Sequence, residues 1–216
     1  MAKDPKPKLR LIRGGADKAS EKTTALPSTG QGDAALLSRK PIYQLRVVLQ
    51  DIEPEIWRRV RVSGNISLGT VHDVIQACMG WENYHLHEFQ LEDGRRFTCQ
   101  DYEPDPGAGD ERKIKLRTAA PGVGAELVYL YDFGDDWYHR VVVEEILPPG
   151  QSGPVPRCLA GARACPPEDV GGPLGYERYL EIMADPRHPD HEDMQNWRGE
   201  LGADVFSPAE ANVRLS

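Results

Sequence analysis

Residues 43–62 read YQLRVVLQDIEPEIWRRVRV and contain two segments in which apolar and polar side chains alternate. Every second residue of 43–49 is apolar, and the alternation returns over 56–62, with Arg58 on the apolar side. A period of two is typical of a half-buried strand, and the short connection between the segments predicts an antiparallel pair. This pair indicates a fold built around an antiparallel sheet.

A helix is predicted directly after the strand pair. Apolar residues at helical spacing run from Val71 to Met79, and Gly80 follows them as a stop signal. Thr70 and Asp73 have the spacing of a capping box at the start of this helix. Its apolar side is therefore expected to pack on the sheet.

The rest of the chain adds strands first and helices last. Strand-like segments lie at 85–91, 95–98, 113–116, 126–131 and 138–146, and helical patterns at 176–183 and after Pro189. Strands and helices do not alternate regularly. The order predicts an α+β fold: a largely antiparallel sheet with one helix packed on it and a helical C-terminal part over 151–216.

Composition divides the chain of 216 residues at about residue 40. Residues 1–40 carry nine Lys or Arg against four Asp or Glu and show no periodicity, which predicts a disordered basic leader. Residues 41–216 are predicted to form a single domain, and the whole chain has a formal net charge of −8. An acidic body repels phosphate backbones, so nonspecific DNA binding by it is not expected.

Two features leave a nucleic-acid interaction open as a weaker hypothesis. The basic leader can contact nucleic acid or another acidic surface. Trp57, Arg59 and Arg61 share one strand face, where an aromatic ring between arginines can stack on bases. The alternative for that face is a solvated surface in which arginines pack on Trp57 and pair with acidic side chains.

The expected compartment is the cytoplasm. The basic start is not followed by the apolar segment of a signal peptide, and no apolar run has the length of a membrane helix, so no membrane partner is expected. The four cysteines are then expected to be reduced and available as metal ligands.

The segment 131–139, with the sequence YDFGDDWYH, contains Asp132, Asp135, Asp136 and His139 between two strand-like runs. Carboxylates and an imidazole that converge at a strand end can bind a metal ion or transfer protons. The alternative is a hairpin turn whose aspartates accept hydrogen bonds from backbone amides. The aspartates and the histidine are therefore candidate site residues.

Two further segments supply candidate ligands, which we expect to line one groove together with the residues of 131–139. His85 and His87 are two residues apart on a predicted strand and would point to one face, as a metal half-site or as partners of nearby carboxylates. Glu168 and Asp169 lie in a Pro- and Gly-rich loop that can present them to a ligand or can use them to cap local amides.

The C-terminal region contains a second candidate metal site. Cys158, Cys165, His188 and His191 are the ligand types of a structural zinc, although the spacing within each pair departs from the usual one. The alternative is two buried thiols and two capping histidines. Zinc is the one cofactor that the sequence suggests.

Several motifs together resemble one known family. They are IWRR at 56–59, WENYHLHEF at 81–89, YDFGDDWYH at 131–139, CPPEDVGG at 165–172 and HPDHED at 188–193. On these motifs the chain resembles the plasmid pRiA4b open-reading-frame-three family over about residues 41–212. The resemblance implies a compact α+β fold and an association with plasmids and mobile elements, and it leaves the activity open.

The function predicted first is that of an accessory or binding protein, whose turns line a groove for a protein or a small-molecule ligand and which contains a structural zinc. The alternative is a metal-dependent hydrolase or nuclease, in which the His and Asp side chains of the groove surround an ion that activates water. An enzyme requires these side chains to meet around an open coordination site, whereas a binding protein does not.

Overall fold

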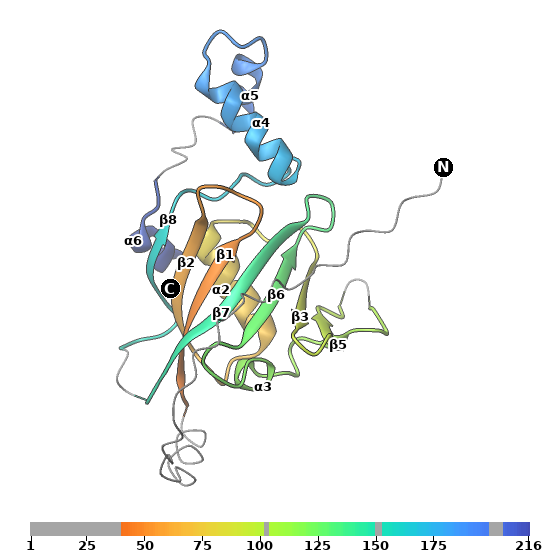
Figure 1. Cartoon of the computed structure of the whole chain (residues 1–216), viewed down its shortest axis with the longest axis vertical. Coiled ribbons are helices and arrows are strands. Elements are labelled where there is room, and N and C mark those ends of the chain that lie inside the picture. The colour runs from red at the N-terminus through yellow and green to blue at the C-terminus, as the bar shows by residue number, and fades with distance from the viewer. Residues whose placement is uncertain (1–39, 102–103, 150–152, 199–204) are drawn as a thin grey trace, which may run out of the picture.

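The computed structural model describes residues 40–101, 104–149, 153–198 and 205–216, so all but the last residue of the predicted leader lies outside the described residues. One eight-stranded sheet forms the body (Figure 1), with the strand order β5-β4-β3-β6-β7-β1-β2-β8. All neighbouring strands are antiparallel except β4 and β5, which confirms the predicted fold class. The strands are β1 (Ile42–Leu49), β2 (Ile56–Ser63), β3 (His87–Leu91), β4 (Arg96–Thr98), β5 (Gly109–Asp110), β6 (Glu126–Tyr131), β7 (Trp137–Leu147) and β8 (Arg157–Ala162).

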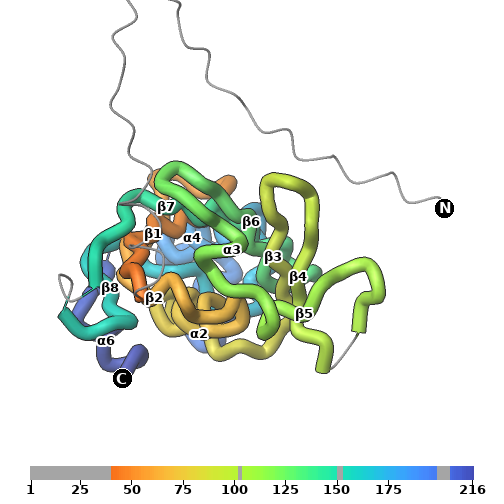
Figure 2. The backbone as a smooth tube through the Cα atoms, turned by 90° about the horizontal axis from the view of Figure 1, so that it is seen from below, coloured from red at the N-terminus to blue at the C-terminus, as the bar shows by residue number. Residues whose placement is uncertain are grey.

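The helix α2 (Leu68–Met79) covers one face of the sheet, as Figures 1 and 2 both show. Its apolar side is buried, as predicted. The N-cap is Ser67, three residues before the predicted Thr70, and its hydroxyl accepts a hydrogen bond from the amide of Thr70. Gly80 ends it in a left-handed conformation with φ of 94°, which glycine adopts without steric cost.

One predicted element, the strand at 113–116, is wrong, and the predicted helical C-terminal part also contains a strand. The predicted strand at 113–116 is instead a connection that leads into α3 (Leu116–Ala119) and lies against the start of α2, where the amide of Leu68 donates to the carbonyl of Ile114. The C-terminal part is not wholly helical, because β8 extends the sheet beside β2. Its helices are α4 (Gly172–Ala184), α5 (His191–Arg198) and α6 (Pro208–Arg214).

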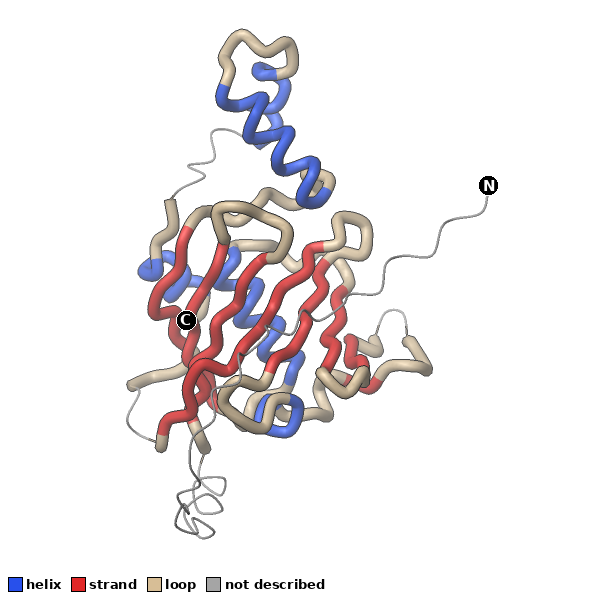
Figure 3. The backbone as a smooth tube through the Cα atoms, in the orientation of Figure 1, coloured by secondary structure: helices blue, strands red, loops and turns tan. Residues whose placement is uncertain are grey.

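The C-terminal helices occupy two different places (Figure 3). α4 and α5 project from one end of the sheet, while α6 packs beside β8 and α2. We call α4, α5 and the residues between them the helical arm. No helix in the described part of the chain is both long enough and apolar enough to cross a membrane. The end of the sheet from which the arm projects is also where the candidate site lies.

Candidate functional site

Three segments that are distant in the sequence meet at this end of the sheet: the residues before β3, the β6–β7 turn and the loop before α4. The Nε2 atom of His85 lies 3.1 Å from Oδ1 of Asp169 and 3.6 Å from Oδ2 of Asp132. One potential ligand atom from each of these residues lies within 4.8 Å of the other two, and we call His85, Asp132 and Asp169 the cluster. Among the residues that the structure describes, this is the one group of three or more His, Cys, Asp or Glu side chains with that geometry.

The β6–β7 turn directs Asp132 toward His85. Asp132 has a left-handed backbone, with φ of 58°, and its Oδ1 atom accepts a hydrogen bond from the amide of Gly134. The amide of Asp136 donates to the carbonyl of Asp132 and closes the turn. Because Oδ1 is used within the turn, Oδ2 remains available for the site.

Glu168 is the fourth acidic or imidazole side chain at this place. Its side chain is buried, and its Oε1 atom accepts hydrogen bonds from the amide of Glu82 and from the hydroxyl of Tyr131. Its Oε2 atom is buried, has no hydrogen-bond partner and lies 3.9 Å from Nε2 of His85. One oxygen of this carboxylate is therefore fixed, and the other faces the cluster.

The loop 165–172 is docked on the sheet by contacts outside the cluster. The indole of Trp81 donates to the carbonyl of Pro166, and the amide of Gly171 donates to Oδ2 of Asp135. Asp135 therefore holds the loop and is not a member of the cluster. Gly172 contacts the same turn, because a Cβ atom on it would lie 2.5 Å from the carbonyl oxygen of Asp135.

Gly172→Ala is expected to destabilise the protein by about 2 kcal/mol or more, because alanine is strained at the observed φ of 70° and its methyl group would collide with backbone. The matched control is Gly122→Ala, since a Cβ there would meet nothing within 4 Å. Urea unfolding of both variants measures the difference. Equal midpoints would show that the loop does not depend on this close approach.

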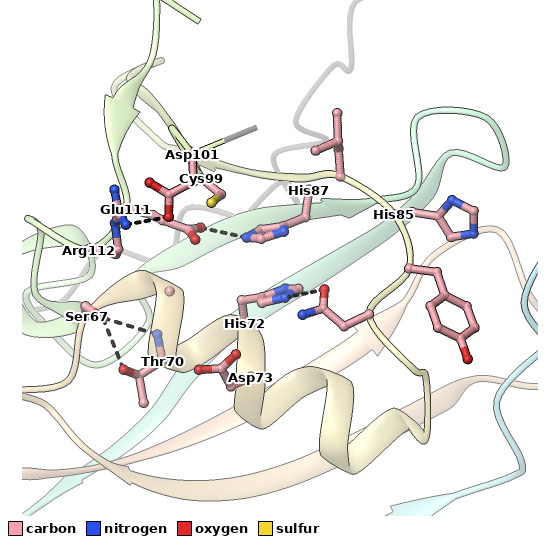
Figure 4. A pocket seen from close by; sticks show the side chains of 14 residues that line it. Ser67, Thr70, His72, Asp73, His85, His87, Cys99, Asp101, Glu111 and Arg112 are labelled. Atoms are coloured by element: carbon pink, nitrogen blue, oxygen red, sulfur yellow. Dashed lines mark hydrogen bonds and ion pairs between the residues drawn. The ribbon is translucent and has the colours of Figure 1, made fainter. Parts of the chain in front are cut away.

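His85 and His87 do not lie on one strand, contrary to the prediction, and their rings point in different directions. β3 begins at His87, and His85 precedes the strand. Figure 4 shows His85 directed away from His87 and Glu111. Both histidines line a cavity of about 800 Å³. Within it, the Nε2 atom of His87 lies 2.7 Å from Oε2 of the buried Glu111.

The cavity contains a pair of stacked imidazoles (Figure 4). The rings of His72 and His87 lie 3.5 Å apart and are nearly parallel. Nε2 of His72 bonds to Oδ1 of Asn83, so it carries the proton, and Nδ1 accepts from the hydroxyl of Tyr129. Burial, assisted by the neighbouring His87, lowers the pKa of His72 to about 3, so this ring is neutral near pH 7.

His72 and Glu111 were not candidates from the sequence. His72 lies among the apolar residues of a helix, and Glu111 follows an acidic Pro- and Gly-rich segment that has no periodic pattern. Their partnership joins two elements through space, so spacing along the chain contains no signal for it.

His139 lies in the core and does not reach the groove. It is fully buried in β7, where its Nδ1 atom bonds to the carbonyls of Tyr129 and Trp137. Burial lowers the pKa of His139 to about 4. Asp136, the last of the predicted groove residues, has a left-handed backbone within the β6–β7 turn.

The structure does not bring the predicted Cys/His set together. No three of Cys158, Cys165, His188 and His191 place ligand atoms within 4.8 Å of one another. Nδ1 of His188 accepts from the amide of Asp190, and Nδ1 of His191 bonds to the carbonyl of Ile182. Burial raises the pKa of the Cys165 thiol, which disfavours the thiolate that a metal requires.

The Trp57 face is occupied by contacts within the protein. The guanidinium groups of Arg46 and Arg59 lie over the Trp57 ring, at 4.3 Å and 5.3 Å from its centre. Arg59 also pairs with Glu144 at 2.5 Å. These contacts match the alternative of a solvated, ion-paired surface.

Comparison with known proteins identifies the family of this protein. Residues 41–214 match the family of plasmid pRiA4b ORF-3-like proteins, and the chain belongs to this family. An uncharacterized protein, y4hQ of Sinorhizobium fredii (strain NBRC 101917 / NGR234), is 42% identical over 173 residues, which cover 79% of this chain and 86% of the relative. A crystal structure of a protein of unknown function, MM3350 from Methanosarcina mazei Go1, is similar with a TM-score of 0.73 and 36% identity, covering 80% of this chain and 98% of that one.

Proposed function

We propose that this protein is an accessory protein that binds a divalent metal ion at the end of its sheet. The observation that carries the proposal is the convergence of His85, Asp132 and Asp169 from three separate segments. The three residues belong to the motifs at 81–89, 131–139 and 165–172.

The charges at the cluster favour a cation. The carboxylates of Asp132, Glu168 and Asp169 all lie within 4 Å of the same imidazole nitrogen. Like charges at such distances repel each other, and a divalent ion among them would relieve the repulsion. Carboxylate oxygens combined with one imidazole suit ions such as Mn²⁺ and Zn²⁺.

The ion would connect the sheet to the helical arm. Asp132 belongs to the sheet, and Asp169 precedes α4, which begins three residues later at Gly172. The arm exposes apolar side chains, with Leu174 at 79% and Trp197 at 42% exposure. A metal-dependent position of this arm would suit an accessory protein that presents a surface to a partner.

A metal-dependent hydrolase is the second candidate. One observation favours it: the side chain of Asp169 is 61% exposed, so solvent reaches the cluster from that side. A water molecule on an open position of the ion could then be activated. The two functions differ in turnover, because only the hydrolase would consume a substrate in a metal-dependent way.

His85→Ala is expected to abolish metal binding, because it removes the ligand on which the other side chains converge. The protein, purified without a metal-binding tag, would be loaded with Mn²⁺ or Zn²⁺, and bound metal would be measured by plasma mass spectrometry. We expect one ion per wild-type chain and none in His85→Ala.

His191→Ala is the matched control, because it removes an imidazole that lies outside the cluster. We expect this variant to retain the ion. Loss of the ion in His191→Ala with retention in His85→Ala would favour the Cys/His set. Absence of metal from the loaded wild-type protein would contradict the proposed function.

A further inference from the structure

We infer that Glu168 is the fourth ligand of the ion and that Tyr131 positions it, so that three carboxylates and one imidazole hold a first-row divalent cation. This inference rests on the proposed function and goes beyond the cluster of three residues. It assigns an ion class, an additional ligand and a positioning residue to the site.

The burial of Glu168 is the first argument. The residue is 5% exposed, and its Oε2 atom has no hydrogen-bond partner although it is enclosed. A buried carboxylate oxygen without a hydrogen bond is unfavourable in a folded protein, and a bound cation would stabilise it. Nε2 of His85 lies 3.9 Å from this oxygen.

Nε2 of His85 gives an independent indication. This atom is also buried without a hydrogen-bond partner, although it lies within 4 Å of three carboxylates. Carboxylates at ion-pair distances from an imidazole nitrogen that makes no hydrogen bond to them can all ligate one ion together with that nitrogen. Two buried atoms on different segments, neither of which makes a hydrogen bond, therefore lie at the same place.

Tyr131 fixes the orientation of Glu168. The Tyr131 side chain is fully buried, and its hydroxyl donates to Oε1 of Glu168 while accepting from the amide of Tyr84. The amide of Glu82 donates to the same Oε1 atom. Both donors hold one oxygen, so the other is directed at the cluster, as outer-shell partners direct the ligands of metal sites.

The ligands determine the net charge of the site when an ion is bound. Three carboxylates exceed the charge of a divalent ion, so the site with a neutral His85 would carry a net negative charge. Such a charge suits an ion that is fully ligated by the protein and connects its segments. The imidazole favours Mn²⁺ or Zn²⁺ over Mg²⁺, which is bound mainly by oxygen ligands.

The test compares Mn²⁺ binding to Glu168→Gln, Tyr131→Phe and Glu82→Gln by isothermal titration calorimetry. We expect Glu168→Gln to weaken binding by more than roughly 100-fold and Tyr131→Phe by about 10- to 100-fold. Glu82→Gln is the matched control and should bind as the wild type does, because its backbone amide still reaches Glu168. Wild-type binding of Mg²⁺ is expected to be at least about tenfold weaker than that of Mn²⁺.

The electron paramagnetic resonance spectrum of bound Mn²⁺ supplies a second readout, because it changes when a ligand changes even if the affinity does not. Wild-type affinity and an unchanged spectrum in Glu168→Gln, together with loss of binding in His85→Ala, would overturn the fourth ligand and leave the proposed function intact. Failure of the wild-type protein to bind Mn²⁺ or Zn²⁺ would overturn both. Circular dichroism would establish that each variant is folded.

Discussion

Acidification from pH 7 to pH 4 is expected to destabilise the folded protein by about 3 kcal/mol for each of the two buried imidazoles, His72 and His139. Both are neutral in the folded state, because burial lowers their pKa values to about 3 and about 4 from the ordinary 6.5. His72 is 3% exposed and His139 is fully buried, so solvent screens neither of them.

The direction of the effect follows from which state binds protons. Below pH 6.5 the imidazoles of the unfolded chain become protonated, while those of the folded chain remain neutral. Acid therefore favours unfolding. Through His139 the free energy of unfolding falls between pH 6.5 and about 4, and through His72 it continues to fall until about pH 3. Above pH 6.5 neither group makes stability depend on pH.

Urea unfolding of the wild type and His139→Phe at several pH values between 4 and 7 measures this contribution. The variant should be less stable at pH 7, because the shape and the hydrogen bonds change, but its stability should fall less as the pH decreases. His188→Gln, which replaces a partly exposed imidazole, is the control. A pH dependence in His139→Phe equal to that of the wild type would contradict the assignment.

The sheet could be predicted from the sequence where side-chain alternation is strong. The two strands of 43–62 pair as expected, in register from Ile42 with Ser63 to Leu49 with Ile56. β8 was missed because its sequence, RCLAGA, contains small side chains and no clear alternation. Its place beside β2 is set by a pairing across about 100 residues, which no local pattern reveals.

The site was predicted less completely, because local patterns do not give side-chain directions at turns. The sequence grouped His85, Asp132 and Asp169 with Glu168, which lies beside them, and with four residues that lie elsewhere. Of these four, His87 pairs with Glu111, His139 lies in the core, and Asp135 and Asp136 belong to the β6–β7 turn. Two of the three cluster residues have left-handed backbones, with φ of 58° at Asp132 and 59° at Asp169. At such positions neither strand nor helix periodicity predicts which way a side chain points.

The burial of Arg58 could be predicted from the sequence, whereas its contacts could not. Alternation placed this residue on the apolar side of β2, and it is 1% exposed in the structure. Its guanidinium donates to the backbone carbonyls of Trp57, Cys78 and Ala162 and lies 3.8 Å from the centre of the Phe206 ring. The side chain thus joins β2, the end of α2, β8 and the segment before α6.

Arg58→Ala is expected to destabilise the protein by about 4 kcal/mol. The change leaves buried carbonyls without their donor and creates a cavity beside Phe206, and both effects are costly in a core. Arg59→Ala is the matched control, since it removes a neighbouring arginine whose ion pair with Glu144 is partly exposed, and it should cost less than Arg58→Ala, about 1 kcal/mol.

Urea unfolding at pH 7 measures both variants, and Arg58→Met separates the two causes because it fills the space without supplying donors. If Arg58→Met loses less stability than Arg58→Ala, the loss that remains in Arg58→Met is due to the unpaired carbonyls. Equal losses in Arg58→Ala and Arg59→Ala would show that the buried guanidinium does not hold these elements together. The expected difference would mean that the IWRR motif owes its buried arginine to architecture, because a side chain enclosed among carbonyls cannot also contact a ligand in solvent.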